Sequence, residues 1–188
     1  MVSPNNILVV GLTAIAYFVL FELNDALFTS FAFSTGVNWI FLPSGLRLVF
    51  ILVFGVWGAF GIALASLIIN LLFYFDGSLV SAVGTALISG FAPLLARSIC
   101  VDLFKLELDL KNLTADTLLK VAVVFALLSP VLHQSWYTLR GHTENFISST
   151  AVMAVGDLTG TLLVLYAAKF LLGLVPGFME KPPQNSQF

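Results

Sequence analysis

Charged side chains are scarce in this chain: Asp, Glu, Lys and Arg make up only 10% of its 188 residues. A soluble globular domain carries roughly 25%, so the composition excludes a soluble domain of this size. The net charge of −2 provides no basic field for nucleic acid. The single cysteine, Cys100, excludes an internal disulfide.

Catalytic and metal-binding motifs are also missing. The sequence contains no HExxH, no GxSxG and no phosphate-binding glycine loop, and its two histidines and one cysteine are scattered. We therefore expect no enzymatic activity, no catalytic residues, no cofactor and no metal site.

Hydrophobic residues, in contrast, make up 59% of the chain, and the mean hydropathy is +1.02. A membrane helix needs about 20 mostly apolar residues. The sequence therefore predicts an all-α, polytopic transmembrane bundle over residues 1–175 and a short cytoplasmic tail over 176–188. The first apolar run has no basic residue before it, unlike a cleaved signal peptide, so we interpret it as a retained span.

About six spans are expected. They are residues 7–23, about 44–54, a full span ending at Tyr74, 79 to about 101, 118 to about 136, and about 149–172. The run 46–75 would be about 45 Å long as one helix, too long for one ordinary span and short for two. Gly55, Gly58 and Gly61 indicate where it turns; if it is one long helix, five spans remain.

Two polar segments separate these runs. Residues 24–38 are expected to form a glycine-containing loop. In 102–117, charged residues alternate with leucines with a period of two, which favours an extended or interfacial segment. Thr114 is a candidate N-cap for the following helix, with Thr117 three residues on.

Basic residues are distributed unevenly between the loops. The side with the 102–117 segment and the last span holds six, and the other side holds Arg47 and Arg140. The six are Arg97, Lys105, Lys111, Lys120, Lys169 and Lys181. The positive-inside rule then predicts a multi-pass protein of the cytoplasmic (inner) membrane with a cytoplasmic C-terminus, and leaves the side of the N-terminus open. Trp39, Trp136 and Tyr137 would join the outer aromatic belt.

Two ionisable residues fall inside the predicted spans. Such side chains are costly in hydrocarbon and normally have a partner. Arg47, early in the second helix, and Asp157, about two turns into the last span, both lie in the outer half, where an ion pair is geometrically feasible. One interpretation is a buried salt bridge that fixes helix register. The other is a ligand or signal site near the pair.

Asn70 and His133 lie near the outer ends of their spans and complete a candidate cluster, for ligand or structure, with Arg47 and Asp157. We expect Asn70 to hydrogen-bond between helices. His133, close to Trp136, is expected to reach water at the interface, with pH sensing or ligand binding as alternatives.

Small residues recur at the spacing typical of helix packing. Gly156 and Gly160 form a GxxxG motif, and Gly55, Ala59 and Ala63 form a stripe. We expect these faces to pack within the monomer rather than to form a dimer.

Four ordered segments resemble one known family. They are Trp39-Ile-Phe-Leu-Pro43-Ser-Gly45-Leu-Arg47, residues 61–72 ending in Asn70-Leu-Leu, residues 108–119, and Gly156-Asp157-Leu-Thr-Gly160-Thr-Leu. Over about 38–172 the chain resembles the first type of membrane-associated sensor domain (MASE). Two features depart from its pattern: Leu-Pro replaces Trp-Pro, and the turn before the third span lacks basic residues.

The resemblance implies a sensory role. MASE domains are usually fused at their C-terminus to cytoplasmic histidine kinase or diguanylate cyclase domains in bacteria, whereas we expect no output domain after Leu172 here. The expected function is thus a stand-alone sensory or regulatory domain that perceives a small ligand or envelope signal and acts on a kinase or cyclase partner. The alternatives are a transport component, such as the substrate-binding subunit of a vitamin importer, and a truncated relic without a signalling role.

Overall fold

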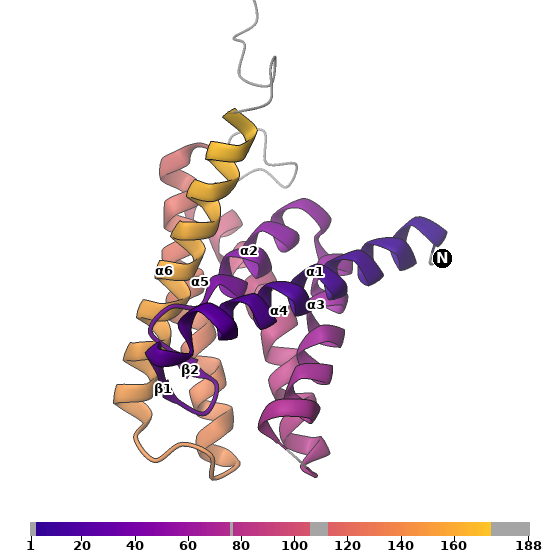
Figure 1. Cartoon of the computed structure of the whole chain (residues 1–188). Coiled ribbons are helices and arrows are strands. Elements are labelled where there is room, and N and C mark those ends of the chain that lie inside the picture. Colours follow the sequence, from indigo (N-terminus) through magenta and orange to yellow (C-terminus); the bar gives the residue numbers. More distant parts are fainter. Residues whose placement is uncertain (1–2, 76, 106–112, 174–188) are drawn as a thin grey trace, which may run out of the picture.

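The computed structural model describes residues 3–75, 77–105 and 113–173, and these ranges fold into a bundle of α-helices (Figure 1). The elements are α1 (Pro4–Phe28), η1 (Thr29–Phe31), β1 (Ala32–Ser34), β2 (Val37–Asn38), α2 (Leu42–Phe54), α3 (Val56–Ile69), η2 (Asn70–Tyr74), α4 (Leu79–Phe104), α5 (Ala115–Leu139) and α6 (Phe146–Gly173). The short strands β1 and β2 pair antiparallel. The all-α prediction, with six helices, is confirmed.

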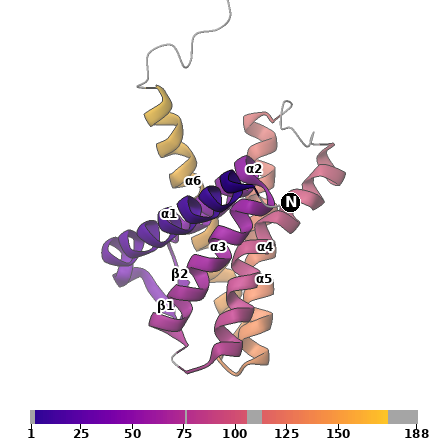
Figure 2. The same cartoon turned by 90° about the vertical axis from the view of Figure 1, so that its right-hand side faces the viewer.

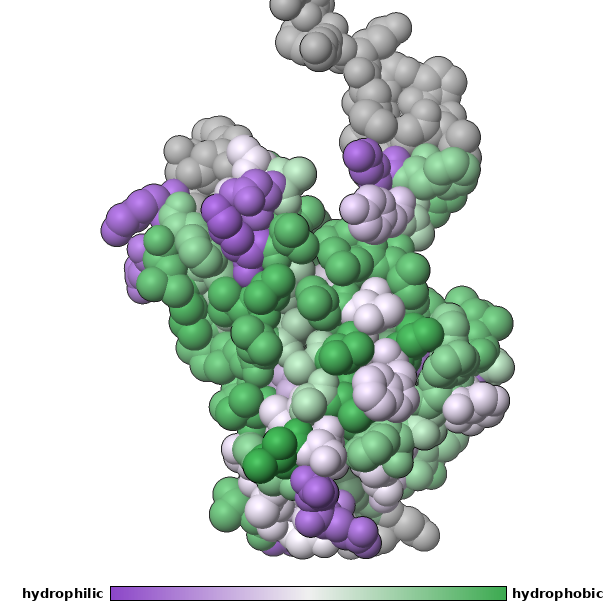
Figure 3. Space-filling model, turned by 90° about the vertical axis from the view of Figure 1, so that its left-hand side faces the viewer, coloured by the Kyte–Doolittle hydropathy of each residue, from purple (hydrophilic) through white to green (hydrophobic). Residues whose placement is uncertain are grey.

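Five of the helices are long and apolar enough to cross a membrane: α1, α3 with η2, α4, α5 and α6. The remaining helix, α2, has 13 residues and is about 20 Å long, shorter than the hydrocarbon core. Hydrophobic side chains cover the middle of the face in Figure 3, and hydrophilic residues gather toward its two ends. The chain is therefore a multi-pass membrane protein with one short helix.

The first helix lies across the bundle rather than along it. In Figures 1 and 2, α1 crosses the direction of α4, α5 and α6 obliquely. Only 17% of its most apolar 18-residue stretch is buried. Its side chains at Ile7, Leu12, Ile15 and Val19 are exposed. An apolar helix with so little protein around it requires lipid on its outer side.

The long apolar run breaks at Gly55, as predicted. Gly55 has φ 56° and ψ −131°, a conformation that only glycine adopts readily. It ends α2 and begins α3, whose Gly58 approaches the backbone of Phe50 so closely that a Cβ would lie 2.6 Å from the carbonyl oxygen. The helix then continues to Tyr74, where the full span was expected to end.

Small residues bring α3 and α4 together within the chain. A Cβ on Gly90 of α4 would lie 2.5 Å from the carbonyl oxygen of Ala59 and 2.9 Å from the Cβ of Ala63. The prediction that this stripe packs inside the monomer is confirmed.

The predicted boundaries of the polar segments need two corrections. The loop was expected to begin at Asn24, but α1 continues to Phe28. The reason is that Asn24 is buried, and its Oδ1 accepts a hydrogen bond of 2.8 Å from the amide of Leu42. The 102–117 segment was expected to be extended or interfacial, but residues 102–104 are the helical end of α4 and residues 115–117 are the helical start of α5.

The predicted cap at Thr114 is confirmed, whereas the predictions for residues 106–112 and for the tail stay untested. Thr114 caps α5 as predicted, since its Oγ1 accepts a hydrogen bond of 3.2 Å from the amide of Thr117. Residues 106–112 and the predicted tail, 176–188, lie outside the described residues.

The basic residues that the sequence assigns to opposite sides of the membrane lie at opposite ends of the folded bundle. Lys169, late in α6, shares a surface groove with Asp116 at the start of α5. Arg140, after the other end of α5, contacts Ser81 at the start of α4. Lys120 and Lys169 therefore lie at one end of the bundle and Arg140 at the other, as the charge count implied.

Candidate functional site: a polar cavity beside a buried ion pair

Arg47 and Asp157 form an ion pair in the interior, which confirms the predicted pairing. The Nη2 atom of Arg47 donates hydrogen bonds of 3.1 Å to both carboxylate oxygens of Asp157. Arg47 is 1% exposed and Asp157 is 0% exposed. Since the pair joins α2 to α6 across 110 residues of sequence, it fixes the position of the short helix.

The glycines of α6 make room for the chain that leads into α2. A Cβ on Gly156 would lie 2.0 Å from the carbonyl oxygen of Asn38, and a Cβ on Gly160 would lie 1.9 Å from that of Phe41. The amide of Phe41 also donates a hydrogen bond of 3.2 Å to the carbonyl of Gly156. The GxxxG motif thus packs within the monomer, as predicted, but against extended backbone rather than against a helix.

The first turn of α2 is also fixed on α6. Pro43 lies in this turn, where a missing N–H costs nothing. The Ser44 hydroxyl lies 2.6 Å from the carbonyl oxygen of Asp157 and 3.0 Å from the hydroxyl of Thr161. A Cβ on Gly45 would lie 2.6 Å from the Cβ of Val164. These contacts place Arg47, one turn further on, opposite Asp157.

The guanidinium group of Arg47 has donors left over. Its carbon lies 5.1 Å from the ring centre of Phe125 and 5.7 Å from that of Phe41, a cation–π arrangement. Its hydrogen bonds to other described residues all go from Nη2 to Asp157. The Nε atom is buried and has no hydrogen-bond partner in the described part of the chain.

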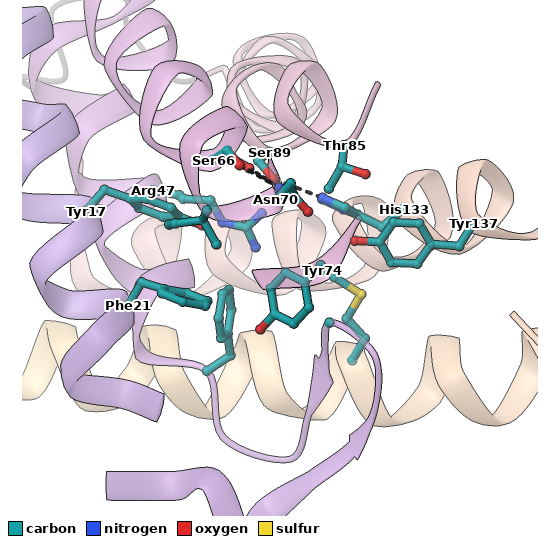
Figure 4. Close-up of a pocket in the computed structure, with 14 residues that line it drawn as sticks. Tyr17, Phe21, Arg47, Ser66, Asn70, Tyr74, Thr85, Ser89, His133 and Tyr137 are labelled. Carbon is teal, nitrogen blue, oxygen red and sulfur yellow. Dashed lines mark hydrogen bonds between the residues drawn. The ribbon is translucent and has the colours of Figure 1, made fainter. Parts of the chain in front are cut away.

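Arg47 also lines a polar cavity, shown in Figure 4. The cavity volume is about 40 Å³, which holds roughly three water molecules at 10–15 Å³ each. Helices α1 to α6, the π-helical turn η2 and the β1–β2 turn all contribute to its wall. The lining residues are Tyr17, Phe21, Gly36, Phe41, Arg47, Ser66, Ile69, Asn70, Tyr74, Thr85, Ser89, His133, Tyr137 and Met153.

Three of the four residues of the predicted cluster line this cavity: Arg47, Asn70 and His133. Asp157 does not, but is joined to it through Arg47. The structure therefore brings all four together. Whether the cluster binds a ligand stays a prediction.

The expectation for Asn70 was wrong in one respect. Its Nδ2 donates to the carbonyl oxygen of Ser66 at 2.6 Å and to the Ser66 hydroxyl at 3.1 Å, both on the preceding turn. These bonds lie within one helix, not between helices. Asn70 begins the π-helical turn η2, in which the amide of Phe75 donates to its carbonyl at 2.8 Å. Such turns are rare and often occur at functional sites.

His133 and Tyr137 were placed at the membrane surface by sequence, and this was wrong. They are 2% and 5% exposed. The His133 Nδ1 lies 2.8 Å from the carbonyl oxygen of Ser129, and its Nε2 lies 3.1 Å from the hydroxyl of Ser89 on α4. His133 therefore joins α5 to α4. Trp39 is exposed, as a belt residue would be, and Trp136 is partly buried over Gly84.

A second polar cluster lies at the end of the bundle that carries the α3–α4 and α5–α6 connections. The sequence did not predict it. Ser81 is its centre. The Ser81 hydroxyl lies 2.8 Å from the Nε2 of His142 and accepts a hydrogen bond of 3.2 Å from the Nε of Arg140. The Ser81 carbonyl accepts a hydrogen bond of 3.2 Å from the indole of Trp136.

Several cavity residues were also missed, above all Tyr17, Ser66 and Tyr74. Ser66 had a signal, because it lies one turn before Asn70. The tyrosines had none, since an aromatic residue in an apolar helix is as compatible with lipid as with a cavity.

Comparison with known proteins adds no relative: no protein-family model, curated protein or solved structure matches this chain. The class established by fold and composition is a multi-pass helical membrane protein with a small polar cavity beside a buried ion pair.

Proposed function

We propose that this chain is a sensory or regulatory membrane domain of the MASE type, in which occupancy of the cavity alters the packing of α2 on α6. The observation that carries the proposal is the position of Arg47, which lines the cavity and binds Asp157 on α6. A molecule that hydrogen-bonds to the unused donors of the guanidinium group would draw it toward the cavity and change its geometry against Asp157. Such a molecule would favour a different state of the pair, as ligand-driven signalling requires.

The output would leave through α6. Tyr166, Phe170 and Leu171 in its last turns are exposed large side chains, suited to contact with another membrane helix. The MASE resemblance implies a kinase or cyclase as the partner. The charge distribution favours a cytoplasmic position for this end of the bundle in the inner membrane.

The size of the cavity favours sensing over transport. Pockets for drug-sized or vitamin-sized ligands have volumes of about 300–1,000 Å³, whereas this cavity has about 40 Å³. A substrate-binding importer subunit would have to open a far larger space. A sensor needs only a ligand of a few atoms.

The partner is the first test. The chain is cross-linked in its native membranes, purified, and its attached proteins are identified by mass spectrometry. A histidine kinase or a diguanylate cyclase is expected. Recovery of an ATPase module instead would overturn the sensory role and support the importer.

The second test asks whether the ion pair carries the signal. Asp157→Asn removes the negative charge at nearly constant shape, and Asp25→Asn does the same at an exposed position on α1. The phosphorylation state or cyclic dinucleotide output of the partner is expected to change only with Asp157→Asn, at equal chain abundance. An equal response to both variants would contradict the proposal.

A further inference from the structure

The cavity wall offers unused hydrogen-bond donors. Among the described residues, Nε and Nη1 of Arg47 have no hydrogen-bond partner. Tyr17 and Tyr74 also line the cavity, and their hydroxyls are able to donate. Figure 4 shows the guanidinium group reaching toward the middle of these residues. Because the buried Nε of Arg47 is destabilising without an acceptor, the cavity favours an occupant with an accepting oxygen.

One acceptor accompanies these donors. Asn70 donates from Nδ2 to the carbonyl of Ser66, which fixes the orientation of its amide because two oxygens would repel at that distance. Its Oδ1 makes no hydrogen bond to another described residue and is left to accept one. The occupant that satisfies both sides therefore carries an acceptor and an N–H or O–H donor.

The charges around the cavity favour a neutral occupant. Arg47 is compensated by Asp157. His133 is satisfied as a neutral ring, since Nδ1 donates to the Ser129 carbonyl and Nε2 accepts from the Ser89 hydroxyl. An ionised ligand would bring an uncompensated charge into a buried site, which is costly.

From these three observations we infer that the cavity binds a small neutral molecule of the amide or urea class. Its carbonyl oxygen accepts from Arg47 and the tyrosine hydroxyls, and its N–H donates to Asn70. The volume of about 40 Å³ limits it to a few non-hydrogen atoms. The inference rests on the proposed function, because it names the ligand of the same site.

Three isosteric probes separate the classes: acetamide is neutral, acetate is its anionic counterpart, and acetamidinium is its cationic counterpart. The chain has only three arginines, Arg47, Arg97 and Arg140. Labelling arginine Nε with ¹⁵N in the full-length protein in lipid nanodiscs therefore gives three N–H signals. Arg97→Lys and Arg140→Lys assign two of them by loss, so that Arg47 is identified without being altered.

Acetamide is expected to shift the Arg47 signal saturably and to leave the other two in place. A ligand of four non-hydrogen atoms reaches a Kd of about 40 µM at best, so the titration extends to 100 mM. Acetate and acetamidinium are expected to bind at least about tenfold more weakly. Tighter binding of either ion, equal shifts of all three arginines, or no shift of Arg47 would overturn the inference.

A conservative variant locates the binding. Tyr74→Phe removes one donor from the wall and is expected to weaken acetamide binding about fivefold, the value of one hydrogen bond. Tyr166→Phe, on the exposed side of α6, is the matched control and should leave acetamide binding unchanged. Equal effects of the two variants would show that acetamide does not bind in this cavity.

Acetamide binding without a change in partner output would overturn the sensory role and leave the ligand class standing. An output change in Asp157→Asn without acetamide binding would overturn the ligand class alone.

Discussion

Two arginines of this chain have similar partners in different surroundings. The Arg47 guanidinium lies 5.1 Å from the ring centre of Phe125, and that of Arg140 lies 5.9 Å from the ring centre of Trp136. Arg47 is buried against Asp157. Arg140 is exposed and donates to the Ser81 hydroxyl.

The two arginines differ in whether water can replace a hydrogen-bond partner that is removed. Asp157 is 11 residues from the start of α6 at Phe146, or about 16 Å along the helix, within the apolar band where water is scarce. Arg140 directly follows α5, at the end of the bundle. Water can take over its hydrogen bonds, so the same type of side chain should matter far less there.

Breaking the Arg47–Asp157 pair should have the largest effect. Asp157→Ala leaves a buried guanidinium without its counter-charge, and we expect a loss of about 3–5 kcal/mol in unfolding free energy. Unfolding in lipid bicelles, followed by circular dichroism during titration with denaturing detergent, measures it. A loss below about 1 kcal/mol would show that the pair is hydrated rather than buried.

The backbone contact under the pair should come next. Gly160→Ala places a methyl group where the carbonyl oxygen of Phe41 lies, 1.9 Å from the new Cβ, and should cost about 1–3 kcal/mol. Gly11→Ala on α1 is the matched control, since beyond the adjacent backbone of α1 and its two chain neighbours no described atom lies within 4 Å of a Cβ there. The same unfolding assay should find the control neutral or slightly stabilised. Equal effects in both would mean that α6 does not hold the chain leading into α2.

Changing the arginine at the end of the bundle should have the smallest effect. Arg140→Gln removes the hydrogen bond to Ser81 and the contact with Trp136, and we expect a loss of no more than about 1 kcal/mol. The assay is the same, at low and high salt. A loss as large as that of Asp157→Ala would remove the distinction between the two sites.

Much of this fold follows from the sequence for identifiable reasons. The break at Gly55 follows from the length of the apolar run, and the cap at Thr114 from its side chain three residues before Thr117. The Arg47–Asp157 pair follows from the small number of charged residues inside the spans, because two opposite charges in a bilayer have few other partners.

The rest depends on tertiary packing. Tyr137 and Trp136 are neighbours in the sequence, and both are aromatic side chains that carry a polar atom. Only Tyr137 is buried in the core. A signal existed in the helix face: Ala122, Ala126, Ser129, His133 and Tyr137 recur at spacings of three and four and form one buried stripe of α5. The oblique direction of α1 had no such signal, because its apolar residues surround the helix.

Arg47 and Asp157 act as one unit that holds the cavity wall on α6. A double-mutant cycle of Arg47→Met and Asp157→Leu, in unfolding free energy in bicelles, measures the coupling between them. Because an apolar pair can replace a buried ion pair at little cost, we predict that the double variant is more stable than either single variant, with a coupling of at least about 2 kcal/mol. If the two losses simply add, the side chains do not interact, and this pair does not hold α2 on α6.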